Sequence, residues 1–141
     1  MIEIRHLISI EAAPEKVYAA VATQAGLAGW WTADSVADDK VGGRAEFGFD
    51  KRSVIFRMSI VVLDPPGSVV WRCHGDNPEW DGTTLTWIVE PADGGSRLRF
   101  TQSGWRAMTD MVAACNSTWG ELMYRLKAYA EGKNPGPHWR E

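Results

Sequence analysis

The sequence predicts an α+β fold in which a curved antiparallel sheet of about six to seven strands wraps around one long C-terminal helix. Two observations lead to this prediction. Apolar and polar residues alternate in a series of segments between residues 44 and 104, which is typical of half-buried strands. The period then changes, and apolar residues recur every three or four positions from Met108 to Tyr129, as in an amphipathic helix.

The first thirty residues predict one strand followed by two short helices. Residues 2–10 alternate between isoleucine and mostly polar residues, which indicates a half-buried strand. A helix is expected to open at Pro14, because proline loses no hydrogen bond in the first helical turn. Gly26 and Gly29 are expected to break this helix, and a short helical turn over residues 27–31 follows it.

Turn signals separate the strands in the middle of the chain. Residues 65–68 (Pro-Pro-Gly-Ser) and 93–96 (Asp-Gly-Gly-Ser) have the composition of tight turns. Short turns join antiparallel neighbours, so the strands should form one meandering sheet. In the strand over residues 54–62, the even-numbered residues are expected to share the apolar face. That face needs a cover, and the long helix supplies it.

The last segment predicts one continuous helix from Met108 to about Glu131. Its apolar stripe extends over about six turns, which is too regular for two separate elements. Gly132 is expected to end the helix, and residues 134–137 (Asn-Pro-Gly-Pro) prevent it from continuing. With 141 residues and no internal repeat, residues 1–141 are expected to form a single domain.

Composition excludes several classes of function. The net charge of −3 gives no electrostatic reason to expect a nucleic acid partner. No apolar run approaches the roughly 18 residues that a membrane span needs, and the N-terminus lacks the pattern of a signal peptide. A cytoplasmic protein with no membrane partner is therefore expected. Cys73 and Cys115 are isolated, which favours two reduced thiols and predicts no metal site and no cofactor.

Motifs of catalysis are scarce in the sequence. It contains no nucleophile elbow, no zinc-protease motif and no glycine-rich phosphate loop, and its three histidines are scattered. The loop over residues 75–82 holds three carboxylates and Trp80. A solvated turn is the favoured interpretation, with acid/base chemistry and a gate plugged by Trp80 as alternatives. The sequence therefore favours a binding protein over an enzyme.

The most unusual feature of the composition is the presence of eight tryptophans. Alternation and the helical period direct a set of large apolar residues and one glutamine into the space between sheet and helix. The residues expected to line a ligand pocket there are Phe47, Phe56, Met58, Trp71, Trp87, Phe100, Gln102, Met111, Cys115 and Trp119. A core filled by the same side chains is the alternative. If the space holds a cavity, Trp119→Ala should lower the free energy of unfolding by less than the loss of about 3–5 kcal/mol that is typical of packed cores.

These elements, in this order, resemble a known family. The residues that carry the resemblance are Ala12 to Tyr18, Trp30-Trp31, Gly42-Gly43, Leu63 to Pro66, Leu85 to Trp87, Gly95 to Leu98, Ser103-Gly104, and Trp119 with Leu122, Leu126 and Tyr129. The chain is similar to the heat-shock-protein ATPase activator homologue (AHSA-like) family of the START-like, birch-pollen-allergen-like (SRPBCC) superfamily. Members often carry histidine where this chain has Gln102, and glycine where it has Thr118.

The resemblance implies a helix-grip fold with a cavity between sheet and helix. It leaves the function open, because the superfamily includes carriers, receptors, enzymes and chaperone cofactors. The leading hypothesis is a protein that binds a small apolar or aromatic ligand. The family name implies a second, an interaction protein that acts as a chaperone ATPase cofactor in a stress response. A third is a cyclase-type or hydrolase-type enzyme that uses carboxylates at the pocket mouth.

Overall fold

A computed structural model describes residues 1–141. The strands are β1 (Ile2–Ile10), β2 (Ser35–Ala37), β3 (Arg44–Phe49), β4 (Val54–Asp64), β5 (Ser68–His74), β6 (Thr84–Ala92) and β7 (Gly95–Trp105). The helices are α1 (Pro14–Ala22), α2 (Gln24–Trp30) and α3 (Asp110–Ala130). All seven strands form one antiparallel sheet in the order β1-β7-β6-β5-β4-β3-β2. The α+β helix-grip architecture predicted from the sequence is confirmed.

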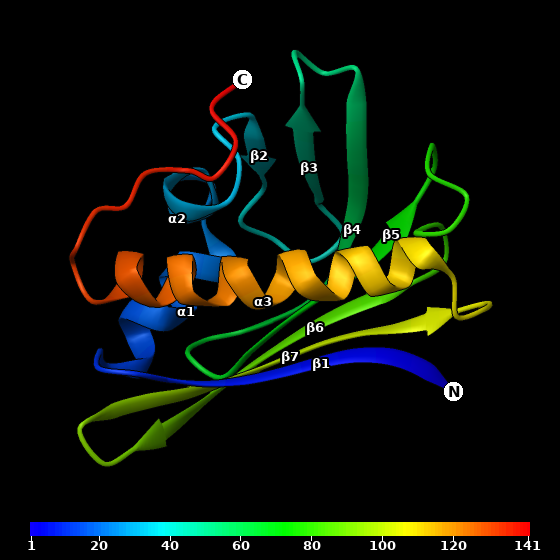
Figure 1. Ribbon diagram of the computed structural model, residues 1–141. Helices are drawn as coiled ribbons and strands as arrows, with labels where there is room; N and C mark the ends of the chain where they lie inside the picture. Colours follow the sequence, from blue (N-terminus) through cyan, green and yellow to red (C-terminus); the bar gives the residue numbers. More distant parts are fainter.

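Helix α3 crosses the curved sheet as one unbroken element (Figure 1). It starts two residues later than predicted, because the Thr109 hydroxyl caps it by accepting a hydrogen bond from the Val112 N–H at 3.3 Å. Met108 therefore lies outside the helix and is exposed. At the other end Gly132 has a φ of +85°, and its N–H donates to the Tyr129 carbonyl at 3.0 Å. This is the glycine stop that the sequence predicts.

The break between α1 and α2 differs from the prediction. Both glycines that were expected to break the helix, Gly26 and Gly29, lie inside α2. The chain turns instead at Thr23, whose hydroxyl accepts a hydrogen bond from the Gly26 N–H at 3.0 Å and so caps α2. A Cβ atom at Gly26 would lie 2.4 Å from the carbonyl oxygen of Ala19. Glycine is needed there because the two short helices approach closely, not because a helix ends.

Two strand features were also not predicted. Strand β2 has three residues, which is too short to show an alternation of apolar and polar residues. In β4 the register shifts between Ile60 and Val62. Because this irregularity adds a residue, Leu63 packs against the core instead of Val62, so the predicted alternation is wrong beyond Ile60.

Large rings fill the centre of the space between the sheet and the helices. Phe47, Trp71, Trp87 and Phe100 project from four strands and are at most 2% exposed. Ring centroids of Phe47 and Trp71 are 5.3 Å apart, those of Trp71 and Trp87 5.7 Å, and those of Trp87 and Phe100 4.4 Å. These are packing distances for aromatic pairs, so this part of the molecule is a filled core.

A carboxylate ties the C-terminal end of α3 to the end of β1. The Glu131 side chain is 6% exposed and accepts hydrogen bonds from the Lys127 ammonium at 2.6 Å, the Glu11 N–H at 2.8 Å and the Lys133 ammonium at 3.1 Å. Lys127 also donates to the Ser9 carbonyl at 2.9 Å. The bonds from Lys127 and Glu11 lower the pKa of Glu131 from its ordinary 4.5 to about 2.

Replacing Glu131 by glutamine is expected to lower the free energy of unfolding by about 1–2 kcal/mol at pH 7. The folded-state pKa lies below the ordinary value, so the carboxylate's contribution is complete above about pH 5 and is lost as the pH falls through 2. Urea denaturation of both proteins at several pH values should therefore show a difference that shrinks with acidification. Asp39→Asn, in an exposed loop, is the control. A difference that stays constant down to pH 2.5 would contradict the assignment.

Candidate functional site

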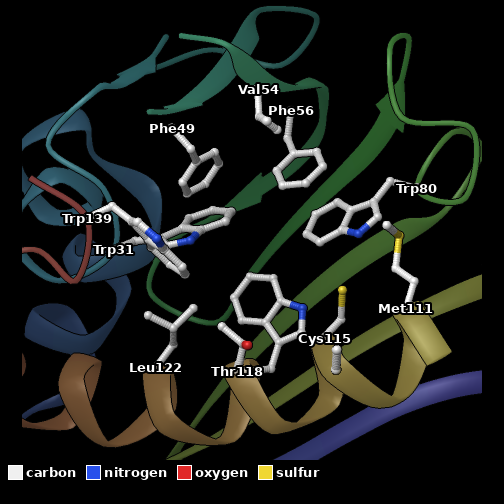
Figure 2. Close-up of a pocket in the computed structure, with 12 residues that line it drawn as sticks. Trp31, Phe49, Val54, Phe56, Trp80, Met111, Cys115, Thr118, Leu122 and Trp139 are labelled. Atoms are coloured by element: carbon white, nitrogen blue, oxygen red, sulfur yellow. The ribbon is translucent and has the colours of Figure 1, made fainter. Parts of the chain in front are cut away.

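An apolar cavity of about 380 Å³ lies between α3 and the hairpin formed by β3 and β4 (Figure 2). This volume falls within the range of small-molecule pockets in proteins. Eleven of its twelve lining residues are hydrophobic, and none is charged. The lining residues are Trp31, Phe49, Val54, Phe56, Trp80, Met111, Ala114, Cys115, Thr118, Trp119, Leu122 and Trp139.

Regular elements supply most of the lining. Helix α3 contributes Met111, Cys115, Thr118 and Leu122, which recur at intervals of three or four residues and so share one face of the helix. On the opposite side stand the side chains at the end of the β3–β4 hairpin, where Phe49 and Val54 are directly paired (Figure 2). Ala114 and Trp119 also come from α3 and Phe56 from β4, and three tryptophans come from irregular segments: Trp31, Trp80 and Trp139.

Aromatic contacts define the shape of the cavity. The rings of Phe56 and Trp80 stack with centroids 3.9 Å apart and planes 9° from parallel. Trp119 continues this wall, with its ring centroid 6.2 Å from that of Trp80 and 5.1 Å from that of Trp31. Trp80 belongs to the loop over residues 75–82 and is 4% exposed, so this loop supplies a wall of the pocket.

A buried amide connects two walls of the pocket. The Gln102 Oε1 atom accepts a hydrogen bond from Trp119 Nε1–H at 3.0 Å, and its Nε2 donates to Thr83 Oγ1 at 3.0 Å. The Thr83 hydroxyl donates in turn to the Trp80 carbonyl at 2.7 Å. Gln102 and Thr83 are fully buried, so each of these bonds satisfies a polar atom that water does not reach. Gln102 thus lies behind the lining and fixes the positions of Trp119 and of the loop that carries Trp80.

The three carboxylates of the same loop are engaged outside the cavity. Asp76 pairs with Arg57, and the Glu79 carboxylate accepts a hydrogen bond from Thr109 at the start of α3. Asp81 accepts from the Gly75 N–H at 3.0 Å. None of the three is a lining residue, so no pair of carboxylates converges on the cavity.

Both thiols are poor nucleophiles in these surroundings. Burial, and to a lesser extent the charge of Asp81, raises the pKa of Cys73 to about 12. Burial also raises the pKa of Cys115, although the neighbouring Trp80 N–H opposes the rise. The thiolate is the reactive form, and it is scarce at pH 7 for both residues. No three His, Cys, Asp or Glu side chains lie close enough together to hold a metal ion.

The structure divides the residues predicted for the pocket into two groups. Phe56, Met111, Cys115 and Trp119 line the cavity. The other six lie in the buried core outside the lining: Phe47, Met58, Trp71, Trp87, Phe100 and Gln102. The cavity is displaced from the centre of the sheet toward the hairpin end, because the core rings already fill the centre.

Eight lining residues were not in the predicted set. Extending the alternation toward the hairpin end would have added Phe49 and Val54, and extending the helical stripe would have added Ala114, Thr118 and Leu122. The sequence indicates Trp80 only as the plug of a gate over the cavity, not as a wall residue. Trp31 and Trp139 follow α2 and α3 in irregular segments, where no periodicity indicates which way a side chain points.

Comparisons with known proteins agree with this architecture. The family model described as activator of Hsp90 ATPase homolog 1-like protein matches residues 11–131. The solution structure of the Aha1 dimer from Colwellia psychrerythraea is 34% identical, with a TM-score of 0.85 over 94% of this chain and 98% of that one. No curated protein sequence matches. None of the helices is long and apolar enough to cross a membrane.

More distant solved structures share the fold alone. A protein from Mesorhizobium loti is 19% identical, with a TM-score of 0.78 over 89% of this chain and 94% of that one. DynU16, a putative protein in the dynemicin biosynthetic locus, is also 19% identical, with a TM-score of 0.82. The match covers 99% of this chain but 51% of DynU16.

Proposed function

The chain belongs to the family of activator of Hsp90 ATPase homolog 1-like proteins, and on this basis we propose that it binds a small, mainly apolar or aromatic molecule in its cavity. The observation that carries the proposal is a space of about 380 Å³ with eleven hydrophobic lining residues and no charge. An apolar occupant gains dispersion contacts with these walls and leaves water. The lining extends from Trp31 to Trp139, so residues 1–141 are proposed to act as one domain.

The walls favour a flat and uncharged ligand. Stacked Phe56 and Trp80 form part of the wall, and Trp119 with Trp31 continues it, so aromatic faces and edges surround the space. A charged ligand would lose its hydration without gaining a partner, because Thr118 is the one polar residue in the lining. Aromatic hydrocarbons of two rings are suitable first probes.

Naphthalene is expected to bind the wild-type protein saturably, with one site per chain and a Kd of roughly 10–100 μM. Ala114→Phe should weaken this binding at least about tenfold, because the new ring occupies the cavity. Ala113→Phe is the matched control, since both alanines are exposed positions of α3 and only Ala114 lines the cavity. Isothermal titration calorimetry measures all three. If wild-type protein binds neither naphthalene nor biphenyl nor indole, the proposed function is wrong.

A second candidate is an interaction protein that acts on the Hsp90 ATPase. It is supported by the description of the matching family and by the 34% identity to Aha1 of Colwellia psychrerythraea. Such a role would use an outer surface rather than the cavity. The rate of ATP hydrolysis by Hsp90 with and without this chain tests it. Ala114→Phe separates the roles, because stimulation through an outer surface would survive the filling of the cavity.

A further inference from the structure

The C-terminal tail supplies one wall of the cavity. After α3 ends, residues 133–139 turn back and run toward α2 and β2 (Figure 1). Trp139 reaches the cavity from this tail, and its ring packs edge-to-face on Phe49 with centroids 5.0 Å apart (Figure 2). It is the one lining residue that lies beyond α3, and it belongs to no helix or strand.

Backbone hydrogen bonds attach the tail to the end of α2. The Trp139 N–H donates to the Trp31 carbonyl at 3.0 Å, and the Trp139 carbonyl accepts from the Ala33 N–H at 2.8 Å. The His138 N–H donates to the Trp30 carbonyl at 3.2 Å. Carbonyl groups at a helix end have no donor within the helix, and the tail satisfies two of them, those of Trp30 and of the C-cap residue Trp31. This attachment fixes the backbone position from which the Trp139 ring projects.

One arginine of α3 holds the preceding part of the tail. The Arg125 Nε–H donates to the Gly136 carbonyl at 2.8 Å, and its Nη2 donates to the carbonyls of Pro135 and Pro137 at 2.9 and 3.3 Å. A planar guanidinium has five donors in a fixed arrangement, so it binds three carbonyls where an ammonium would bind fewer. The two prolines also restrict the backbone of this stretch. The tail is therefore clamped at both ends.

We propose that Trp139 sets the size of ligand that the cavity accepts, and that Arg125 is a positioning residue that holds the tail, and with it Trp139, in place. This inference rests on the proposed function. A ligand that extends from the cavity toward the tail must displace the Trp139 ring, and displacement breaks the ring's contact with Phe49. Removing the ring opens this end of the cavity without changing the walls on α3 and β4.

The selectivity of the protein between naphthalene and the larger pyrene tests whether Trp139 limits the size of the ligand. Wild-type protein is expected to prefer naphthalene, and Trp139→Ala should shift the ratio of the two affinities at least about tenfold toward pyrene. Tyr124→Ala, which removes an exposed aromatic ring of α3 outside the cavity, should leave the ratio unchanged. Saturable binding by wild-type protein with an unchanged ratio in Trp139→Ala would overturn the inference. Absence of binding of naphthalene, biphenyl and indole to wild-type protein would instead overturn the proposed function, and this inference with it.

Hydrogen exchange tests the positioning role without any ligand. Arg125→Met keeps most of the side chain's length but removes every donor, so the amides of Ala33 and Trp139 should exchange at least about tenfold faster. The selectivity ratio should move in the same direction as in Trp139→Ala. Arg125→Lys restores a single donor group, so its exchange rates and its selectivity ratio should lie between those of wild type and Arg125→Met. It also replaces Arg125→Met in the test if that variant does not fold. Faster exchange with unchanged selectivity would show a merely structural role and overturn the assignment.

Discussion

Trp119→Ala is expected to lower the free energy of unfolding by about 3–5 kcal/mol, as truncations of large rings in packed cores do. The Trp119 side chain is 2% exposed, and its ring lies 4.4 Å from that of Phe100 and 5.1 Å from that of Trp31, centroid to centroid. The variant would also leave Gln102 Oε1 buried without a donor. The sequence alone favoured a smaller loss for a residue beside a cavity. The structure predicts a larger loss of unfolding free energy, because only one side of the Trp119 ring faces that cavity.

Denaturant unfolding of three proteins separates the two contributions. Trp119→Phe keeps a ring in the core but removes the indole N–H, so its loss should be about 1–3 kcal/mol, the cost of an unsatisfied buried acceptor. The remaining loss in Trp119→Ala then measures packing. A total loss below about 1.5 kcal/mol for Trp119→Ala would show that the ring is a dispensable wall of a larger void.

Gly26→Ala and Gly120→Ala are expected to change stability in opposite directions, although both glycines lie inside helices. A Cβ at Gly26 would lie 2.4 Å from the Ala19 carbonyl oxygen and 2.8 Å from the Ala20 Cα, both backbone atoms that cannot turn away. The helices must separate, at a cost of about 1–3 kcal/mol. At Gly120 the nearest atom is Cε1 of His6 at 3.4 Å, an ordinary contact. There alanine should add about 0.5–1 kcal/mol, because it favours the helix.

Thermal and urea unfolding of both glycine variants check this pair. Each is the control for the other, since the same methyl group is added in a helix interior. Equal effects of the two substitutions would mean that helix propensity outweighs the close approach of α1 and α2. A stabilised Gly26→Ala would contradict the packing described for the two short helices.

Periodicity predicted the parts of the fold that repeat. The alternation through Phe56 and the helical spacing through Trp119 placed both residues correctly on faces that meet. Periodicity did not predict the irregular features. The register shift after Ile60 and the turn at Thr23 depend on contacts between elements, which the local sequence does not show.

The cavity itself was harder to place than the fold. Alternation shows that Trp87 and Phe56 both point inward, but not that one enters a filled core and the other a space. A cavity arises where the backbones diverge faster than side chains can fill the gap, which is a property of the assembled elements. Trp139 could not be placed for another reason. It lies in an irregular tail that hydrogen bonds from Arg125 hold in place, and no periodic pattern indicates where its side chain points.

Gln102 has a consequence for how the cavity responds to acidity. Its amide neither gains nor loses a proton in the ordinary pH range, and the groups it binds, the Trp119 indole and the Thr83 hydroxyl, do not titrate there either. A histidine at this position would become charged near pH 6.5 and would then require different partners. In this chain the hydrogen bonds that Gln102 makes are therefore electrically neutral. Mild acidification therefore has no means, through this residue, of loosening the pocket.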